Sequence, residues 1–147
     1  MKPLALVLML ILAGARAQGE GLPVAPGLWQ AESRVEAYRL ADGTRSPLPE
    51  VTTSHSRCIG ADRPEISVRD LAGAGCDASE ISRKDGSISF VLACRRQGAD
   101  FYGSMSAERL DSGNRARTHM ELSGRRSDGS EIQIIAESTA QRTGTCD

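Results

Sequence analysis

The sequence has few aromatic side chains, few histidines and almost no lysine. Aromatic residues make up 3% of the 147 residues, which leaves little material for the stacked platforms that hold bases or sugars. The histidines are His55 and His119, and the lysines are Lys2 and Lys84. This composition disfavours proteins that grip nucleic acids or carbohydrates through aromatic side chains.

Motifs of the common catalytic classes are missing as well. There is no Gly-x-Ser-x-Gly elbow, no Ser-x-x-Lys pair and no phosphate-binding glycine loop followed by a helix. The sequence contains no Cys-x-x-Cys, and His55 and Cys58, three residues apart on a predicted strand, would point to opposite faces. We therefore predict that the chain is not an enzyme and has no cofactor and no metal site.

The first seventeen residues have the pattern of a secretory signal peptide. Lys2 gives a positive start, an apolar run extends from Leu4 to Leu12, and Ala15-Arg16-Ala17 fits the small-x-small cleavage site. The run is about half of the roughly 20 residues that a membrane-spanning helix needs, and no cysteine follows the cleavage site to carry a lipid. We expect cleavage before Gln18, export to the periplasm (or secretion) and no stable membrane anchor.

The remainder, residues 18–147, has the length of one domain. Sixteen basic residues against nineteen acidic ones remain after Lys2 and Arg16 are removed, a formal charge of −3. Such a chain lacks the basic surface that binds nucleic acid.

Four cysteines in an exported chain predict disulfides. Asp85-Gly86 lies between two alternating runs, which is a strong hairpin signal. Folding about that turn brings Cys76 opposite Cys94 and leaves Cys58 to pair with Cys146, the favoured one of three connectivities. In a regular strand Cys76 and Ile81 would point to opposite faces. If Ile81 faces the core, the pairing of Cys76 with Cys94 requires a β-bulge between Cys76 and Ile81.

Period-two alternation predicts the other strands and their inward faces. The predicted turns carry Asp-Gly, Ser-Pro or Ser-Gly pairs, and a short helix is expected between Asp62 and Leu71, with Asp62 as its cap. The residues expected to face inward are Trp29, Ala31, Ser33, Val35, Ala37, Ile88, Phe90, Leu92, Cys94, Ala99, Phe101, Gly103, Met105, Ala107, Ala116, Thr118, Met120, Leu122, Ile132, Ile134 and Ala136.

About seven strands in an antiparallel meander form an all-β fold. A sheet with one apolar face has to curl into a barrel or fold into a two-layer sandwich to hide that face. The predicted fold is therefore a barrel-like or sandwich domain with one short helix and two disulfides. A link from Cys58 to Cys146 would suit barrel closure.

Several fixed points along the chain resemble a known family. They are Pro26-Gly27-Leu28-Trp29, a cysteine closing the second strand, Gly73-Ala74-Gly75-Cys76, Cys94 and the terminal Gly144-Thr145-Cys146. Their order and the four-cysteine framework are similar to domain of unknown function family 3617, small exported proteins of the Gram-negative envelope. The resemblance implies an envelope location and a β-rich fold, and it brings no activity and no catalytic residue.

Two functions follow from these observations as hypotheses. The first is a binding or accessory module that holds a small apolar ligand or an envelope protein, with Trp29, Phe101 and Tyr102 as candidate contacts. The second is a periplasmic inhibitor of an exogenous hydrolase such as lysozyme or a protease, which would present either the turn 46–49 or the edge at Phe101 and Tyr102. For Trp29 the alternative is a purely structural core position.

Overall fold

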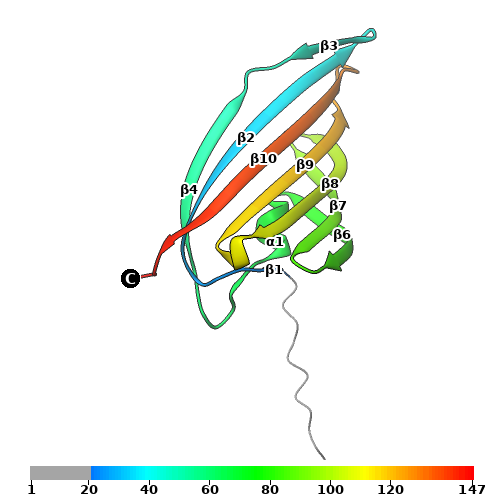
Figure 1. Ribbon diagram of the computed structural model, residues 1–147. Coiled ribbons are helices and arrows are strands. Elements are labelled where there is room, and N and C mark those ends of the chain that lie inside the picture. The colour runs from blue at the N-terminus through cyan, green and yellow to red at the C-terminus, as the bar shows by residue number, and fades with distance from the viewer. Residues whose placement is uncertain (1–20) are drawn as a thin grey trace, which may run out of the picture.

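An eight-stranded antiparallel sheet dominates the protein, as a computed structural model that describes residues 21–147 shows (Figure 1). The signal peptide expected over residues 1–17 lies outside the described residues. The elements in chain order are β1 (Leu22–Pro23), β2 (Gly27–Ala41), β3 (Thr44–Pro47), β4 (Val51–Ile59), β5 (Glu65–Ile66), α1 (Val68–Ala72), β6 (Cys76–Lys84), β7 (Ser87–Arg96), β8 (Ala99–Leu110), a 3-10 turn (Asp111–Gly113), β9 (Arg115–Arg125) and β10 (Glu131–Gly144).

The strands follow one another around an incomplete ring. From β6 to β10 each strand pairs with the next in the chain, β10 pairs with β2, and β2 pairs with both β3 and β4 along its other edge. The first long strand thus meets the last one, as in a closed meander. The ring is interrupted between β4 and β6, so the sheet is strongly curled and open rather than a closed barrel, and the all-β fold class is confirmed.

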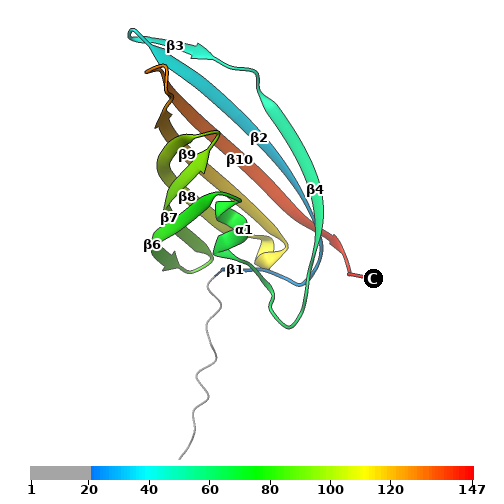
Figure 2. The same cartoon turned by 180° about the vertical axis from the view of Figure 1, so that it is seen from behind.

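The segment between β4 and β6 covers the open side of the ring. It contains β5, which pairs with β1, and then α1; seen from the concave side, α1 lies in front of the sheet between β4 and β6 (Figure 2). Ser67 caps this helix, since its side chain accepts a hydrogen bond from the backbone N–H of Asp70. The helix therefore begins later than predicted, because Asp62 lies in the loop before β5 and the residues after it pair with β1.

The inward face of the sheet is the one that the alternation predicts. Ile88, Phe90, Leu92 and Cys94 of β7 are at most 3% exposed. The residues that pair with them on β8 face the same side of the sheet: Phe90, for example, pairs with Met105, which is also buried. These buried residues form one core cluster on the concave side.

The hairpin of β6 and β7 has the predicted disulfide and the predicted bulge. Cys76 lies opposite Cys94 and is bonded to it, and the register of the two strands shifts between Ser79 and Ser82. The second disulfide joins Cys58 to Cys146, also as predicted. It does not close the ring, however, because β4 and β10 flank β2 and the gap lies on the other side of β4.

The segment 41–49 contains the short strand β3. Asp42 and Gly43 both have positive φ, at 52° and 75°, as the two central residues of a tight hairpin turn do. The turn lets β3 pair with the end of β2 before the chain crosses to β4, and Leu48 N–H donates to the carbonyl oxygen of Ala37 on the way.

Candidate functional site

The concave side of the sheet holds a cavity of about 350 Å³. Inward-facing side chains of β2, β8, β9 and β10 form its floor, β4 forms one wall, and α1 with the end of β7 forms the opposite rim. The apolar residues of the floor are Trp29, Ala31, Val35, Met105, Met120, Ala136 and Ala140. A concave site with an apolar lining and a few polar groups is the usual form of a small-molecule site.

Strand register explains why the floor has free space above it. Ala31 pairs with Ala140 on one side and with His55 on the other, and Ala140 pairs with Ala116. Three alanines in a row across three strands leave a shallow stretch where larger residues would fill the ring. Met105 and Met120, which pair with each other, line the cavity farther along the strands with flexible thioether side chains that adapt to varied shapes.

Two polar side chains of the floor hydrogen-bond to each other. The hydroxyls of Ser33 and Ser138 lie 2.6 Å apart on paired positions of β2 and β10. Their hydrogen bond leaves less polar capacity to attract water or a polar ligand at the centre of the cavity. The floor therefore presents a largely apolar surface.

An ion pair bridges the gap in the ring at the cavity wall. The guanidinium Nη1 of Arg57 on β4 lies 2.7 Å from Oδ2 of Asp70 on α1, and the hydroxyl of Ser67 donates to the same oxygen at 2.6 Å. Partial burial acts to raise the pKa of Asp70, but the hydrogen bonds from Ser67 and Arg57 prevail and hold that pKa below its ordinary value. Asp70 is thus a carboxylate that fastens α1 to β4.

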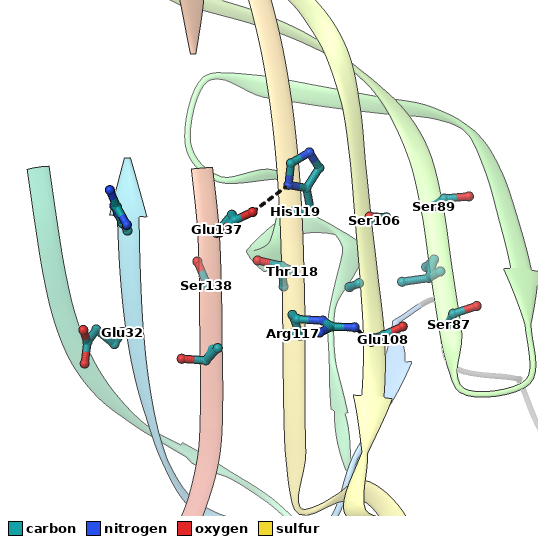
Figure 3. A pocket seen from close by; sticks show the side chains of 14 residues that line it. Glu32, Ser87, Ser89, Ser106, Glu108, Arg117, Thr118, His119, Glu137 and Ser138 are labelled. Carbon is teal, nitrogen blue, oxygen red and sulfur yellow. Dashed lines mark hydrogen bonds and ion pairs between the residues drawn. The ribbon is translucent and has the colours of Figure 1, made fainter. Parts of the chain in front are cut away.

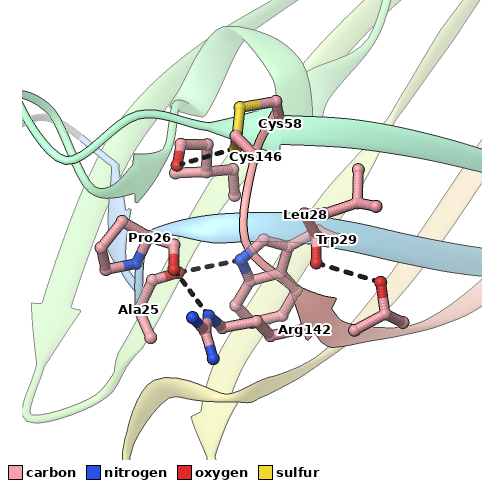
Figure 4. Close-up of a disulfide and its surroundings, with 9 residues drawn as sticks. Ala25, Pro26, Leu28, Trp29, Cys58, Arg142 and Cys146 are labelled. Atoms are coloured by element: carbon pink, nitrogen blue, oxygen red, sulfur yellow. Dashed lines mark hydrogen bonds between the residues drawn. A yellow bond between two sulfur atoms is a disulfide. The ribbon is translucent and has the colours of Figure 1, made fainter.

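Trp29 closes one end of the cavity and is held rigidly. Its side chain is 3% exposed, and its indole Nε1 donates to the carbonyl oxygen of Ala25 at 2.9 Å. Arg142 Nε donates to the carbonyl oxygen of Pro26 at 2.6 Å, and the disulfide of Cys58 lies on the same end of β2 (Figure 4). The indole is a fixed wall rather than a mobile lid.

A second cavity of about 600 Å³ lies toward the other end of the concave face. Phe101, Ile132 and Ile134 line it together with Leu48 from the segment between β3 and β4. Arg96, the last residue of β7, lines both cavities. It has the inward parity of Cys94, whereas the neighbouring Arg95 points outward and pairs with Asp100 at 3.6 Å.

The outer face of the sheet carries a polar groove of about 720 Å³ (Figure 3). Side chains of the groove meet across strands: Arg117 forms an ion pair with Glu108, and His119 Nδ1 lies 3.5 Å from Glu137 Oε1. His119 Nε2 also lies 3.0 Å from Glu121. His119 is therefore on the outer face, and the ion pair of Arg117 and Glu108 joins neighbouring strands within the groove.

The three predicted contact residues lie in different places. Trp29 lines the first cavity and Phe101 lines the second, where its ring packs over Gly124. Tyr102 is on the outer face and 64% exposed. The structure thus places two of them on the concave side and does not bring the three together.

Sequence reasoning missed the histidine and the two arginines that line the first cavity. His55 and Arg57 share the inward parity of Ile59, and Arg96 shares that of Cys94, so extending the alternation to the strand ends would have identified all three. Among residues 21–147 no group of three or more His, Cys, Asp or Glu side chains is arranged to hold a metal ion. In the same part of the chain no helix has the length and apolar character to cross a membrane.

Comparison with known proteins gives one match. The family model described as "Protein of unknown function (DUF3617)" matches residues 24–146. Neither the curated proteins nor the solved structures contain a match. The matched range includes every residue of the cavity and all four cysteines.

Proposed function

The chain belongs to DUF3617, a family of proteins of unknown function, and on that premise we propose that it is a non-catalytic module that binds a small apolar ligand in the concave cavity. The observation that carries the proposal is the floor of the cavity, in which alanines and methionines from four strands leave about 350 Å³ of space on the inner side of a curled sheet. Natural ligand sites have this size and character.

The ring supports the proposal because most of it is rigid. The floor strands are hydrogen-bonded on both sides, so the cavity is pre-formed and a ligand pays little to organise it. Access is provided by the gap between β4 and β6, where α1 and not a strand covers the opening. On β4 the inward residues Val51, His55 and Arg57 are exposed, which leaves that side of the cavity open to solvent.

The two disulfides indicate an oxidising compartment outside the cytoplasm. We propose that the protein is periplasmic and forms a single domain over residues 18–147, on the basis of the signal peptide expected at residues 1–17. The ligand would then be an apolar molecule of the envelope. An envelope protein docked at the same opening is the related possibility that crosslinking in cells would detect.

A cavity-filling substitution tests the proposal. Ala140→Phe places a ring on the floor, and Thr139→Phe places the same ring on the outer face of the same strand. We expect the neutral dye N-phenyl-1-naphthylamine to bind the wild type and Thr139→Phe alike and to bind Ala140→Phe far more weakly. Urea unfolding of each variant checks that the fold persists.

Two results of these experiments would contradict the proposal. Absence of dye binding to the wild type, together with no molecule seen by native mass spectrometry of protein purified gently from periplasm, would rule out the apolar-ligand function. Equal binding to the two phenylalanine variants would move the site away from the cavity.

The alternative function, inhibition of an exogenous hydrolase, has one exposed anchor. Tyr102 is an exposed aromatic side chain on the outer face, whereas Leu48 of the candidate turn packs against the core. An inhibitor would insert such an anchor into an enzyme cleft. Lysozyme and protease assays that show no inhibition at micromolar protein would dismiss this function.

A further inference from the structure

Arg96 occupies an unusual place on the concave side, between the two cavities and in the lining of both. Its guanidinium contacts the sulfur of Cys76 at 3.8 Å, and sulfur is a weak acceptor. Within residues 21–147 no carboxylate forms an ion pair with Arg96. The other arginine of the first cavity, Arg57, is already neutralised by Asp70.

The formal charge of the residues that line the two cavities is opposite in sign to that of the chain. Three arginines line the two cavities, Arg57, Arg96 and Arg126, against two aspartates, Asp70 and Asp128. The chain as a whole has a formal charge of −1. A cleft with a local positive excess and apolar walls concentrates field lines and attracts anions.

Gly73, which has no side chain, lies beside the guanidinium of Arg96. Gly73 follows α1 with φ +81°, and a Cβ built on it would lie 3.7 Å from Arg96 Nη2. That distance is an ordinary van der Waals contact, so Gly73 borders the guanidinium directly, and any other residue there would have a strained left-handed backbone. The planar fork of an arginine suits a carboxylate, which it can bind through two parallel hydrogen bonds.

The two cavities differ in what they offer to the rest of such a ligand. Toward Trp29 the lining is mostly apolar, with alanines and methionines on the floor. Toward Phe101 the lining includes Arg126, Ser127 and Asp128. An apolar chain attached to a carboxylate at Arg96 is therefore better accommodated toward Trp29.

We propose that the ligand is a single-chain fatty acid whose carboxylate is bound by Arg96 and whose hydrocarbon chain lies on the floor that ends at Trp29. This assignment rests on the proposed function, since it names the class of apolar ligand that the same cavity takes. Apolar burial supplies most of the affinity, and the ion pair selects the acid over neutral and cationic amphiphiles of equal length.

Trp29 provides a direct readout, because it is the only tryptophan of the chain. Its emission is recorded while dodecanoate, dodecanol or dodecylamine is added below the concentration at which each aggregates, and isothermal titration gives the affinities. We expect dodecanoate to bind the wild type at least about tenfold more tightly than dodecanol does, because a hydrogen bond to a charged group typically adds that much affinity. Dodecylamine should bind more weakly than either.

Two arginine variants locate the headgroup. Arg96→Gln should lower the affinity for dodecanoate to that for dodecanol and leave the affinity for dodecanol unchanged. Arg95→Gln, on the neighbouring outward residue, should retain the preference for the acid. Both side chains are exposed, so neither substitution endangers the fold.

Each contrary result has a separate meaning. Equal binding of acid and alcohol by the wild type would overturn the fatty-acid assignment and leave the proposed function standing. A preference for the acid that persists in Arg96→Gln would overturn the role of Arg96. No binding of any of the three amphiphiles would contradict both the assignment and the proposed function.

Discussion

Gly103 on β8 faces the inner side of the sheet, where the backbone of the next strand approaches it closely. A Cβ built on Gly103 would lie 1.7 Å from the carbonyl oxygen of Glu121 on β9. Glycine inside a strand often marks such a close backbone approach in curled sheets. At the scale of single residues, the path of β8 against β9 thus depends on a missing side chain.

Substitution of Gly103 tests this dependence. Gly103→Ala should lower the free energy of unfolding by about 1–3 kcal/mol, the usual cost of overpacking a tight interior, because the two backbones have to separate. The midpoint of urea unfolding measures the loss. Gly144→Ala is the matched control, since a Cβ there would meet nothing within 4 Å; an equal loss in both variants would contradict the steric explanation.

Asp70 makes a second residue-scale prediction, a dependence of stability on pH. Its pKa in the folded protein lies below the ordinary value, against the effect of burial and because of its bonds to Ser67 and Arg57. The stabilising contribution is therefore present above the unfolded pKa, which is about 4, and is lost as the pH falls through the folded pKa. Because the carboxylate is 37% exposed, solvent screening keeps the contribution below about 1 kcal/mol.

The measurement compares unfolding free energies at pH 6 and pH 3. The wild type should lose more stability between these values than Asp70→Asn, which lacks the titrating group. Asp77→Asn removes an exposed carboxylate with no ion pair in the described part of the chain and should lose as much as the wild type. A pH dependence unchanged by Asp70→Asn would show that the ion pair to β4 contributes nothing.

At the scale of elements, the long strands could be predicted because alternation is a local signal. The inward face from Trp29 to Ala37 and from Ile88 to Cys94 follows from parity alone, and so does the bulge that lets Cys76 meet Cys94. Alternation could not predict where α1 begins or that β5 is a strand. Pairing of β5 with β1 joins residues more than forty positions apart, and it overrides the weak helical signal at Asp62.

The cavity was less accessible to sequence reasoning than the strands that form it. Trp29 was a candidate because it is a single large aromatic residue, but Arg57, Asp70 and Arg96 come from three elements. Their proximity depends on the gap in the ring, and alternation carries no information about where a curled sheet stops. Tyr102 was a candidate by proximity to Phe101, although neighbours in a strand face opposite sides.

The disulfides make an element-scale prediction, because they close loops of different length. Cys76 and Cys94 are 18 residues apart, and Cys58 and Cys146 are 88 apart. By the loop-entropy relation they contribute about 3 and about 4.5 kcal/mol. The pair of alanine substitutions at Cys58 and Cys146 should therefore lower the unfolding free energy by more than the pair at Cys76 and Cys94.

Urea unfolding of the two double variants, beside the wild type, gives the comparison. A larger loss from the short hairpin loop would show that strain or residual structure in the unfolded chain outweighs loop closure. Intact mass after alkylation verifies that the remaining bridge is formed in each variant.

At the scale of the whole molecule, the interrupted ring predicts where the backbone is protected. β9 and β10 are hydrogen-bonded to neighbours on both sides, whereas β4 and β6 each have one free edge. Native-state hydrogen exchange should be slowest in β9 and β10 and faster in β4, because local opening begins where fewer hydrogen bonds have to break. Protection of β4 equal to that of β10 would indicate that another chain or a ligand covers its edge.

The gap between β4 and β6 also determines the mechanical character of the molecule. Widening a closed barrel would break a ladder of backbone hydrogen bonds, whereas here α1 lies between the two edges, and the ion pair of Arg57 and Asp70 joins α1 to β4. We therefore expect the sheet to resist deformation along the hydrogen-bonded path from β4 through β2, β10, β9, β8 and β7 to β6. The gap between β4 and β6 should deform more easily. We therefore expect that moving β4 away from α1 would break this one ion pair and leave the hydrogen bonds of the sheet intact.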